Sequence, residues 1–125
     1  MMKITIPNYH CASRNQTNKG HWTKYVSAKD EVTSLISLYG RIKKTIDVPV
    51  LVVITAYFKK ERHIDSTNID DKIYVDALRY AGILKDDNYY YNPVVAKRVL
   101  INQGEDKVEI EIIECNPEGE FKFSQ

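Results

Sequence analysis

The amino-acid sequence predicts an α+β domain with a small mixed β-sheet, on which two helices pack, in the order β-α-β-α-β-β. Two segments with apolar residues at helical spacing predict the helices. The run VPVLVVITAYF at 48–58 is apolar at nearly every position, which is typical of a central strand buried on both faces. The chain ends in two strand-like segments, residues 93–101 and 107–114, and residues 102–106 between them predict a hairpin loop.

The N-terminal third is expected to contain a short strand, a long loop and the first helix. Residues 2–7 alternate and end in proline, as a short strand does. Residues 8–26 are polar without a helical period, and such a long loop in a compact domain is often functional. Ser27 is a good N-cap with Asp30 three residues later, so we expect the helix to begin there. Its apolar positions are Val32, Leu35, Ile36, Tyr39 and Ile42.

The second helix is expected to begin at Thr67 or Asn68, which are both good N-caps. Asp70 and Asp71 then lie in the first turn, where the helix dipole favours anions. Gly82 is a natural residue to end the helix. The stripe expected to face the core consists of Ile69, Ile73, Ala77 and Ala81.

Length and composition indicate one soluble domain. The 125 residues suit a single domain, residues 1–125, with a polar tail from about residue 116. No run approaches the ~18–20 apolar residues that cross a bilayer, and the first residues lack the apolar region of a signal peptide. Cys11 and Cys115 are far apart and are expected to be free thiols. We therefore expect a cytoplasmic protein without membrane contact.

The charges are grouped along the chain. The net charge of +1 does not indicate the strongly basic domain that usually binds nucleic acid. However, the basic run FKKER at 58–62 comes directly before the acid-rich run HIDSTNIDDK at 63–72. A net charge near zero therefore allows a basic surface beside an acidic pocket.

Acidic residues flank the second helix. Asp65 precedes it, and Asp86 and Asp87 follow it. If the chain turns back so that they meet, each pair of carboxylates repels by roughly 4 kcal/mol at ~4 Å and an effective dielectric of 20, so a cation is needed. Oxygen ligands favour Mg²⁺ or Mn²⁺, and such a site beside lysines suits phosphodiester cleavage. The alternative is that these acids only form turns, caps and solvated surface pairs, such as Lys72 with Asp76.

The run D-x-x-N-x-x-x-K-x-x-x-D-A-L-x-x-A-G-x-L-x-D-D, from Asp65 through Asp87, resembles the RusA-type Holliday junction resolvases of bacteria and phages. Outside this run, Ser13 and Asn15 resemble a degraded form of the family's N-terminal proline-serine-asparagine segment. YVSAKDE at 25–31 is similar to the start of its first helix. Lys97 lies in a strand that often carries a lysine in the family. The elements of the central motif are Asp65, Asn68, Lys72, Asp76-Ala77-Leu78, Gly82 and Asp86-Asp87.

The resemblance implies a small homodimeric endonuclease that binds four-way DNA junctions in recombination and repair. It implies symmetric nicks in two strands, with magnesium held by aspartates. Asp65, Lys72 and Asp87 match catalytic positions of the family, with Asp65 and Asp87 as metal ligands. A two-fold dimer suits such a substrate, because a junction presents two equivalent strands.

Thr67 departs from the family pattern, because it occupies the place of the second motif aspartate. Its hydroxyl is neutral and cannot replace a charge. Three interpretations stay open. Asp70, or alternatively Asp71 or Asp86, supplies the missing carboxylate; the site works with two carboxylates; or the protein binds junctions without cutting them. The hypothesis we favour is that Asp70 supports the metal.

Basic and aromatic residues are candidates for DNA contacts. Each phosphate contact should make binding more sensitive to salt, although a lysine can also be only a solvated charge. Tyr89, Tyr90 and Tyr91 could stack on bases or open the junction, or instead pack in a core or a dimer interface. The basic candidates are Lys59, Lys60, Arg62, Lys97, Arg14 and Lys24, followed by His63, Arg98, Lys19 and His21.

Three functional hypotheses therefore remain. The first is a metal-dependent, structure-selective nuclease. The second is a junction-binding protein of prophage origin whose cleavage is weakened or lost through Thr67. The third is a non-nuclease domain with chance motif matches. For a dimer, an exposed edge of the sheet is the expected contact surface.

Overall fold

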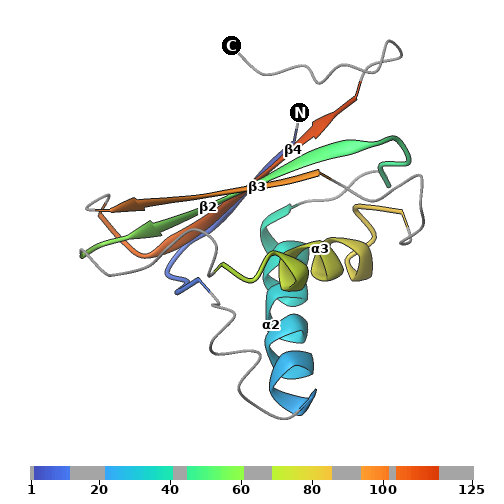
Figure 1. The fold of residues 1–125 in the computed structure, drawn as a ribbon. Helices are drawn as coiled ribbons and strands as arrows, with labels where there is room; N and C mark the ends of the chain where they lie inside the picture. The colour runs from blue at the N-terminus through green and yellow to red at the C-terminus, as the bar shows by residue number, and fades with distance from the viewer. Residues whose placement is uncertain are drawn as a thin grey trace.

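A computed structural model describes residues 2–11, 22–40, 45–60, 69–85, 94–101 and 104–115. The described residues form two helices and a four-stranded mixed sheet, which confirms the predicted α+β class and element order (Figure 1). Neither described helix is long and apolar enough to cross a membrane. The elements are β1 (Met2–Ile6), α2 (Trp22–Gly40), β2 (Val50–Phe58), α3 (Asp71–Tyr80), β3 (Val94–Ile101) and β4 (Lys107–Glu114).

The strands lie in the order β1-β4-β2-β3. β2 pairs in parallel with β3 and antiparallel with β4, and β4 also pairs antiparallel with β1. β2, the most apolar strand, therefore has a partner on each side, as the sequence predicted for a central strand. The predicted hairpin between β3 and β4 is wrong, because these strands lie on opposite sides of β2. The chain between them must cross the end of β2.

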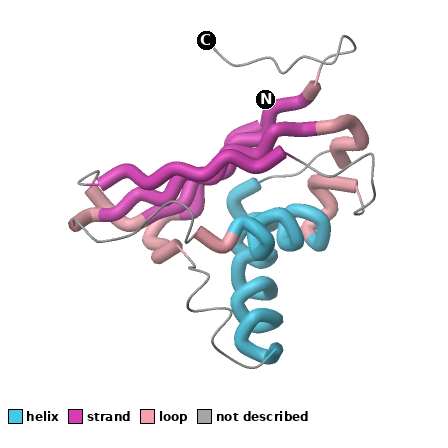
Figure 2. Tube along the Cα trace, viewed as in Figure 1, coloured by secondary structure: helices cyan, strands magenta, loops and turns pink. Residues whose placement is uncertain are grey.

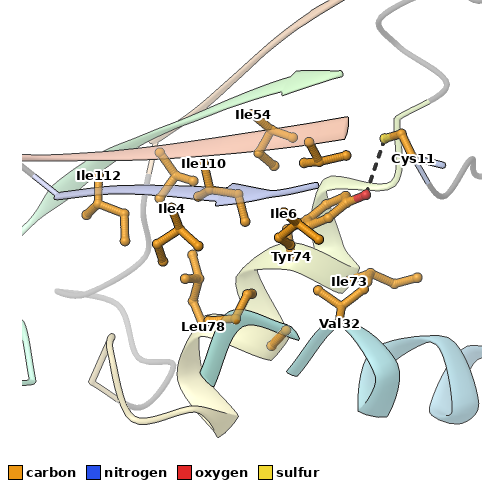
Figure 3. Close-up of a cluster of buried hydrophobic side chains, with 14 of the residues drawn as sticks. Ile4, Ile6, Cys11, Val32, Ile54, Ile73, Tyr74, Leu78, Ile110 and Ile112 are labelled. Carbon is orange, nitrogen blue, oxygen red and sulfur yellow. Dashed lines mark hydrogen bonds between the residues drawn. The ribbon is translucent and has the colours of Figure 1, made fainter. Parts of the chain in front are cut away.

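Both described helices cover the same face of the sheet, α3 being the crossover between β2 and β3 (Figures 1 and 2). The core lies between this face and the helices, where isoleucines of three strands meet apolar residues of α2 and α3 (Figure 3). Each such side chain contributes about 1.5–3 kcal/mol on full burial. Fully buried members are Ile4, Ile6, Val32, Ile36, Ile54, Ile73, Leu78, Ile110 and Ile112.

The opposite face of the sheet carries charged and polar side chains among apolar ones, and no described helix covers it (Figures 1 and 2). The guanidinium Nε of Arg98 donates to Thr55 Oγ1 at 2.8 Å, and a second nitrogen lies 3.5 Å from Glu111. Lys3 pairs with Glu109 at 3.4 Å. The prediction that β2 is buried on both faces is therefore only partly right. Its residues toward the helices are buried, whereas the alternate ones, Thr55 excepted, are half-buried beside these polar groups.

α2 begins at Trp22, so the prediction of a start at Ser27 is wrong. Residues 22–26 include no helix breaker, and Tyr25 packs against the core, which favours an earlier start. Ser27 itself is exposed within the helix. The expected apolar stripe is confirmed for Val32 and Ile36, which are fully buried, and for Leu35, which packs against the core. Tyr39 is 42% exposed, and Ile42 lies outside the described residues.

α3 has Asp70 as its N-cap, so the predicted start at Thr67 or Asn68 is wrong. The core-facing stripe is confirmed at Ile69, Ile73 and Ala77, while Ala81 is half-buried. Gly82 adopts φ +82°, which confirms it as the residue that ends the helix. Its N–H donates to the Arg79 carbonyl at 3.0 Å, and that of Ile83 donates to the Leu78 carbonyl at 3.0 Å, as in a Schellman motif.

Candidate functional site

The N-terminal end of α3 lies against the middle of β3, because Asp71 and the Ile69 carbonyl contact Lys97, whose register partner is Ile54 in the middle of β2. In open sheets with such crossovers, ligand sites form at the carboxyl ends of parallel strands. The candidate site is therefore expected between the start of α3 and the carboxyl ends of β2 and β3. Five residues assigned to it from the sequence, Asp65, Thr67, Asn68, Asp86 and Asp87, lie outside the described residues.

Asp70, directly before α3, is a buried acid with 4% of its surface exposed. Its Oδ1 accepts a hydrogen bond from the backbone N–H of Ile73 at 3.4 Å, which is the capping contact. Burial of a carboxylate is tolerated here because unpaired N–H groups and the helix dipole favour negative charge. Asp70 thus has a structural role that is independent of any metal.

Asp71 and Lys97 tie the start of α3 to β3. Lys97 lies on the helix-facing side of the sheet, since its register partner is the buried Ile54. Its ammonium is 3.3 Å from Asp71 Oδ1 and 3.4 Å from the carbonyl oxygen of Ile69. The side chain of Lys97 is only 19% exposed. This candidate phosphate-binding lysine is thus engaged with the start of α3.

Lys72 is exposed on the first turn of α3, and its ammonium lies 5.1 Å from the centroid of the Tyr25 ring of α2. The Tyr25 hydroxyl donates to Asp76 Oδ2, and Arg79 lies 3.5 Å from the other oxygen of Asp76. Burial and the hydrogen bond to Asp76 raise the pKa of Tyr25, so that its phenol stays neutral. Asp76 is therefore held by Tyr25 and Arg79 rather than forming the expected surface pair with Lys72.

Asp106 joins three segments at the same end of the sheet. Its Oδ1 accepts from the backbone N–H of Lys59 at 2.8 Å, and its Oδ2 is 3.1 Å from His10 Nδ1. Its carbonyl oxygen accepts from the Tyr9 N–H at 3.1 Å. Sequence reasoning missed this residue, because its contacts depend on how the chain crosses the end of β2. The contacts fix where β2 ends, next to Lys60 and the segment that carries Asp65.

Cys11 and Tyr74 form a buried polar pair near this end, with Sγ and the phenol oxygen 3.2 Å apart (Figure 3). Burial raises the pKa of the Cys11 thiol to about 11 and that of Tyr9 to about 12. With these raised pKa values Cys11 and Tyr9 keep their protons near pH 7, and Cys11 and Tyr74 are part of the hydrophobic core. Cys11 and Cys115 are both free thiols, as predicted.

The remaining candidates for DNA contact fall into three groups. Lys24, Lys59 and Lys60 are exposed. Arg98 lies on the helix-free face, bound to Thr55 and Glu111. Arg14, Lys19, His21, Arg62, His63 and the tyrosines 89–91 lie outside the described residues.

Within the described ranges, no three histidine, cysteine or acidic side chains gather in a way that could hold a metal. Two of the three predicted ligands, Asp65 and Asp87, are not in those ranges. In comparisons with known proteins, no family model matches the chain and no curated protein matches it.

Proposed function

We propose that this protein is a magnesium-dependent endonuclease that acts as a homodimer and resolves four-way DNA junctions by paired, symmetric nicks. One observation carries the proposal: the resolvase-like run from Asp65 to Asp87. Support comes from the described part of this run, which forms the crossover helix α3 with Asp70 as its N-cap and Asp71 bound to Lys97 of β3.

Under this proposal, Asp65 and Asp87 hold the metal, and Asp70 supports it. Carboxylate oxygens are the ligands that Mg²⁺ prefers, and Mn²⁺ accepts the same set. When bound, the metal activates water and offsets charge on the scissile phosphate. Asp70 suits a supporting role because a carboxylate has two oxygens, and the helix N-terminus stabilises its charge. Lys72, exposed in the first turn two residues after the cap, adds positive charge beside the phosphate that is cut.

The exposed Lys59 and Lys60 contact DNA phosphates in this proposal. They directly follow β2, next to the segment that contains Asp65, and the bond from the Lys59 N–H to Asp106 fixes their backbone. Their side chains are exposed, as a phosphate contact requires. Junction affinity should therefore fall steeply with salt, and less steeply when both lysines are replaced by glutamine.

The experiment is to incubate the protein with an end-labelled synthetic four-way junction, with and without Mg²⁺, beside a linear duplex of the same sequence. We expect paired nicks at symmetric positions that depend on the metal and on the branched structure. If the linear duplex is cut equally well, the protein is a general nuclease and does not select junctions. Absence of both binding and cutting at low salt would contradict the proposal.

A second function, junction binding without cleavage, is favoured by Thr67 in place of the second motif aspartate. Asp70→Asn separates the two functions, because asparagine caps a helix about as well as aspartate but carries no charge. If Asp70 supports the metal, this variant keeps its stability and its junction affinity but loses cleavage. Unchanged cleavage would remove Asp70 from the metal site. A wild-type protein that shifts the junction without cutting it would support the second function.

A further inference from the structure

The exposed Lys72 has a specific neighbour on the other helix. Its ammonium lies over the ring of Tyr25, at 5.1 Å from the centroid. A lysine side chain on a helix surface has several rotatable bonds and normally samples many positions. A cation over an aromatic face is attracted by the negative charge density of the ring. The contact with Tyr25 therefore restricts where the ammonium of Lys72 can lie.

Tyr25 is itself held in place. Its hydroxyl donates to Asp76, which lies one helical turn after Lys72 on α3. Asp76 is held in turn by Arg79, whose side chain is only 12% exposed. Tyr25 also packs against the hydrophobic core. The ring is thus fixed at both its apolar and its polar end, so it offers Lys72 a rigid surface.

We propose that Tyr25 is a positioning residue for Lys72, holding the ammonium beside the N-terminal end of α3. The inference rests on the proposed function, in which Lys72 stabilises charge on the phosphate. Asp76 acts one step further away, by fixing the phenol of Tyr25. Because the lysine is oriented before DNA binds, less of its side-chain freedom is lost in the transition state.

The same two helices carry a matched control. Lys29, one turn after Tyr25 on α2, lies 4.0 Å from the centroid of the Tyr80 ring at the end of α3. This second pair has the same chemistry but is two turns further from the helix start, and Tyr80 is 72% exposed. If the effect were only helix–helix adhesion, replacing either tyrosine would change the protein in the same way.

The test compares Tyr25→Leu, Tyr25→Phe and Tyr80→Leu by single-turnover nicking of a four-way junction at saturating protein, with junction affinity measured separately. We expect nicking to slow about tenfold in Tyr25→Leu with unchanged affinity, since small misplacements of a catalytic group are costly. Tyr25→Phe keeps the ring and should fall between Tyr25→Leu and wild type. Tyr80→Leu should nick at the wild-type rate. Equal rates in Tyr25→Leu and wild type would overturn the proposal.

A double-mutant cycle separates positioning from general damage. In a Lys72→Ala background, Tyr25→Leu should slow nicking no further, because its effect passes through the lysine. Additive losses would show that Tyr25 acts on something other than Lys72 and would overturn the proposal.

NMR of the protein with ¹³C-methylated lysines gives a readout that does not need activity. The methyl signal of Lys72, assigned with Lys72→Arg, should shift when Tyr25 becomes leucine and stay in place when Tyr80 becomes leucine. If the Lys72 signal does not shift in Tyr25→Leu, Tyr25 does not position Lys72, even if the protein cuts junctions. If the wild type does not nick, the proposed function fails, and this signal alone decides whether Tyr25 positions Lys72.

Discussion

The two ends of α3 are held by different forces. At the C-terminal end, backbone hydrogen bonds close the helix around Gly82, and the following Ile83 and Leu84 are buried. At the N-terminal end, charged and polar side chains hold the helix: Asp70 caps it, and Asp71 binds Lys97 of β3.

Under the proposed function, the difference separates a structural end from a chemical end. Apolar burial and a glycine turn give stability without presenting any reactive group. Buried or half-buried charges stabilise less per group, because each must be removed from water. Charged contacts also reach the last turn, where Arg79 lies 3.5 Å from Asp76, so it is the proposed function that assigns the chemistry to the N-terminal end. The predictions below change one end at a time.

The largest effect is expected from Leu78→Ala at the structural end. Leu78 is fully buried, and its carbonyl accepts the bond from Ile83. Loss of its side chain leaves a cavity and should lower the free energy of unfolding by about 2–5 kcal/mol. Urea denaturation measures this, with Tyr80→Ala as the exposed control, which should stay within about 0.5 kcal/mol of wild type. A small effect of Leu78→Ala would mean that this end is loosely packed.

Alkaline pH should act through the buried thiol of Cys11, which packs against Tyr74 of α3. The pKa of the Cys11 thiol is raised from 9.0 to about 11, so the folded protein holds its proton where the unfolded chain has lost it. Stability is therefore complete below about pH 9 and falls as the pH rises toward 11, by about 2–3 kcal/mol for this thiol. Urea denaturation at pH 8, 9, 10 and 11 measures the slope, which Cys11→Ala should reduce. An equal slope in that variant would assign the effect to other groups such as Tyr9.

Gly82→Ala should cost about 1–2 kcal/mol, because an L-residue at φ +82° is strained. No other atom lies within 4 Å of the added Cβ, so the cost is conformational and involves no clash. Thermal unfolding checks this value. Junction nicking by the folded variant should equal that of wild type, and slower nicking would contradict the division between the two ends.

The smallest effect is expected from Lys97→Met, which keeps the apolar stem and removes the ammonium. It loses the contacts with Asp71 and the Ile69 carbonyl, worth about 1 kcal/mol for a partly buried pair. A double-mutant cycle with Asp71→Asn should give a coupling that shrinks in high salt. Zero coupling would show that the ion pair does not hold the helix start.

Local signals in the sequence were enough to predict the elements and their order. The apolar period of α3, its glycine stop and the apolar run of β2 each act within a few neighbouring residues. The predicted start of α3 was wrong because Thr67, Asn68 and Asp70 are all good N-caps, and spacing alone does not choose between them. α2 begins before the predicted residue because Tyr25 contacts Asp76 of α3. This contact joins residues that are far apart in the sequence.

Pairing across the sheet could not be predicted for the same reason. A short link between β3 and β4 resembles a hairpin loop, yet β2 lies between these strands. The role of Asp106 follows from this crossing and has no local signal. Likewise, Lys97 looked like an exposed cation, and only the register with β2 shows that it faces the helices.

The central claim is that the N-terminal end of α3 carries the chemistry, and the single-turnover nicking rate of Lys72→Ala tests it most directly. Lys72 is exposed, so its loss should change the free energy of unfolding by no more than about 0.5 kcal/mol. We predict that nicking of a four-way junction at saturating protein falls about a hundredfold or more, since charge stabilisation in the transition state is lost. A variant that remains folded and nicks the junction at the wild-type rate would contradict the claim.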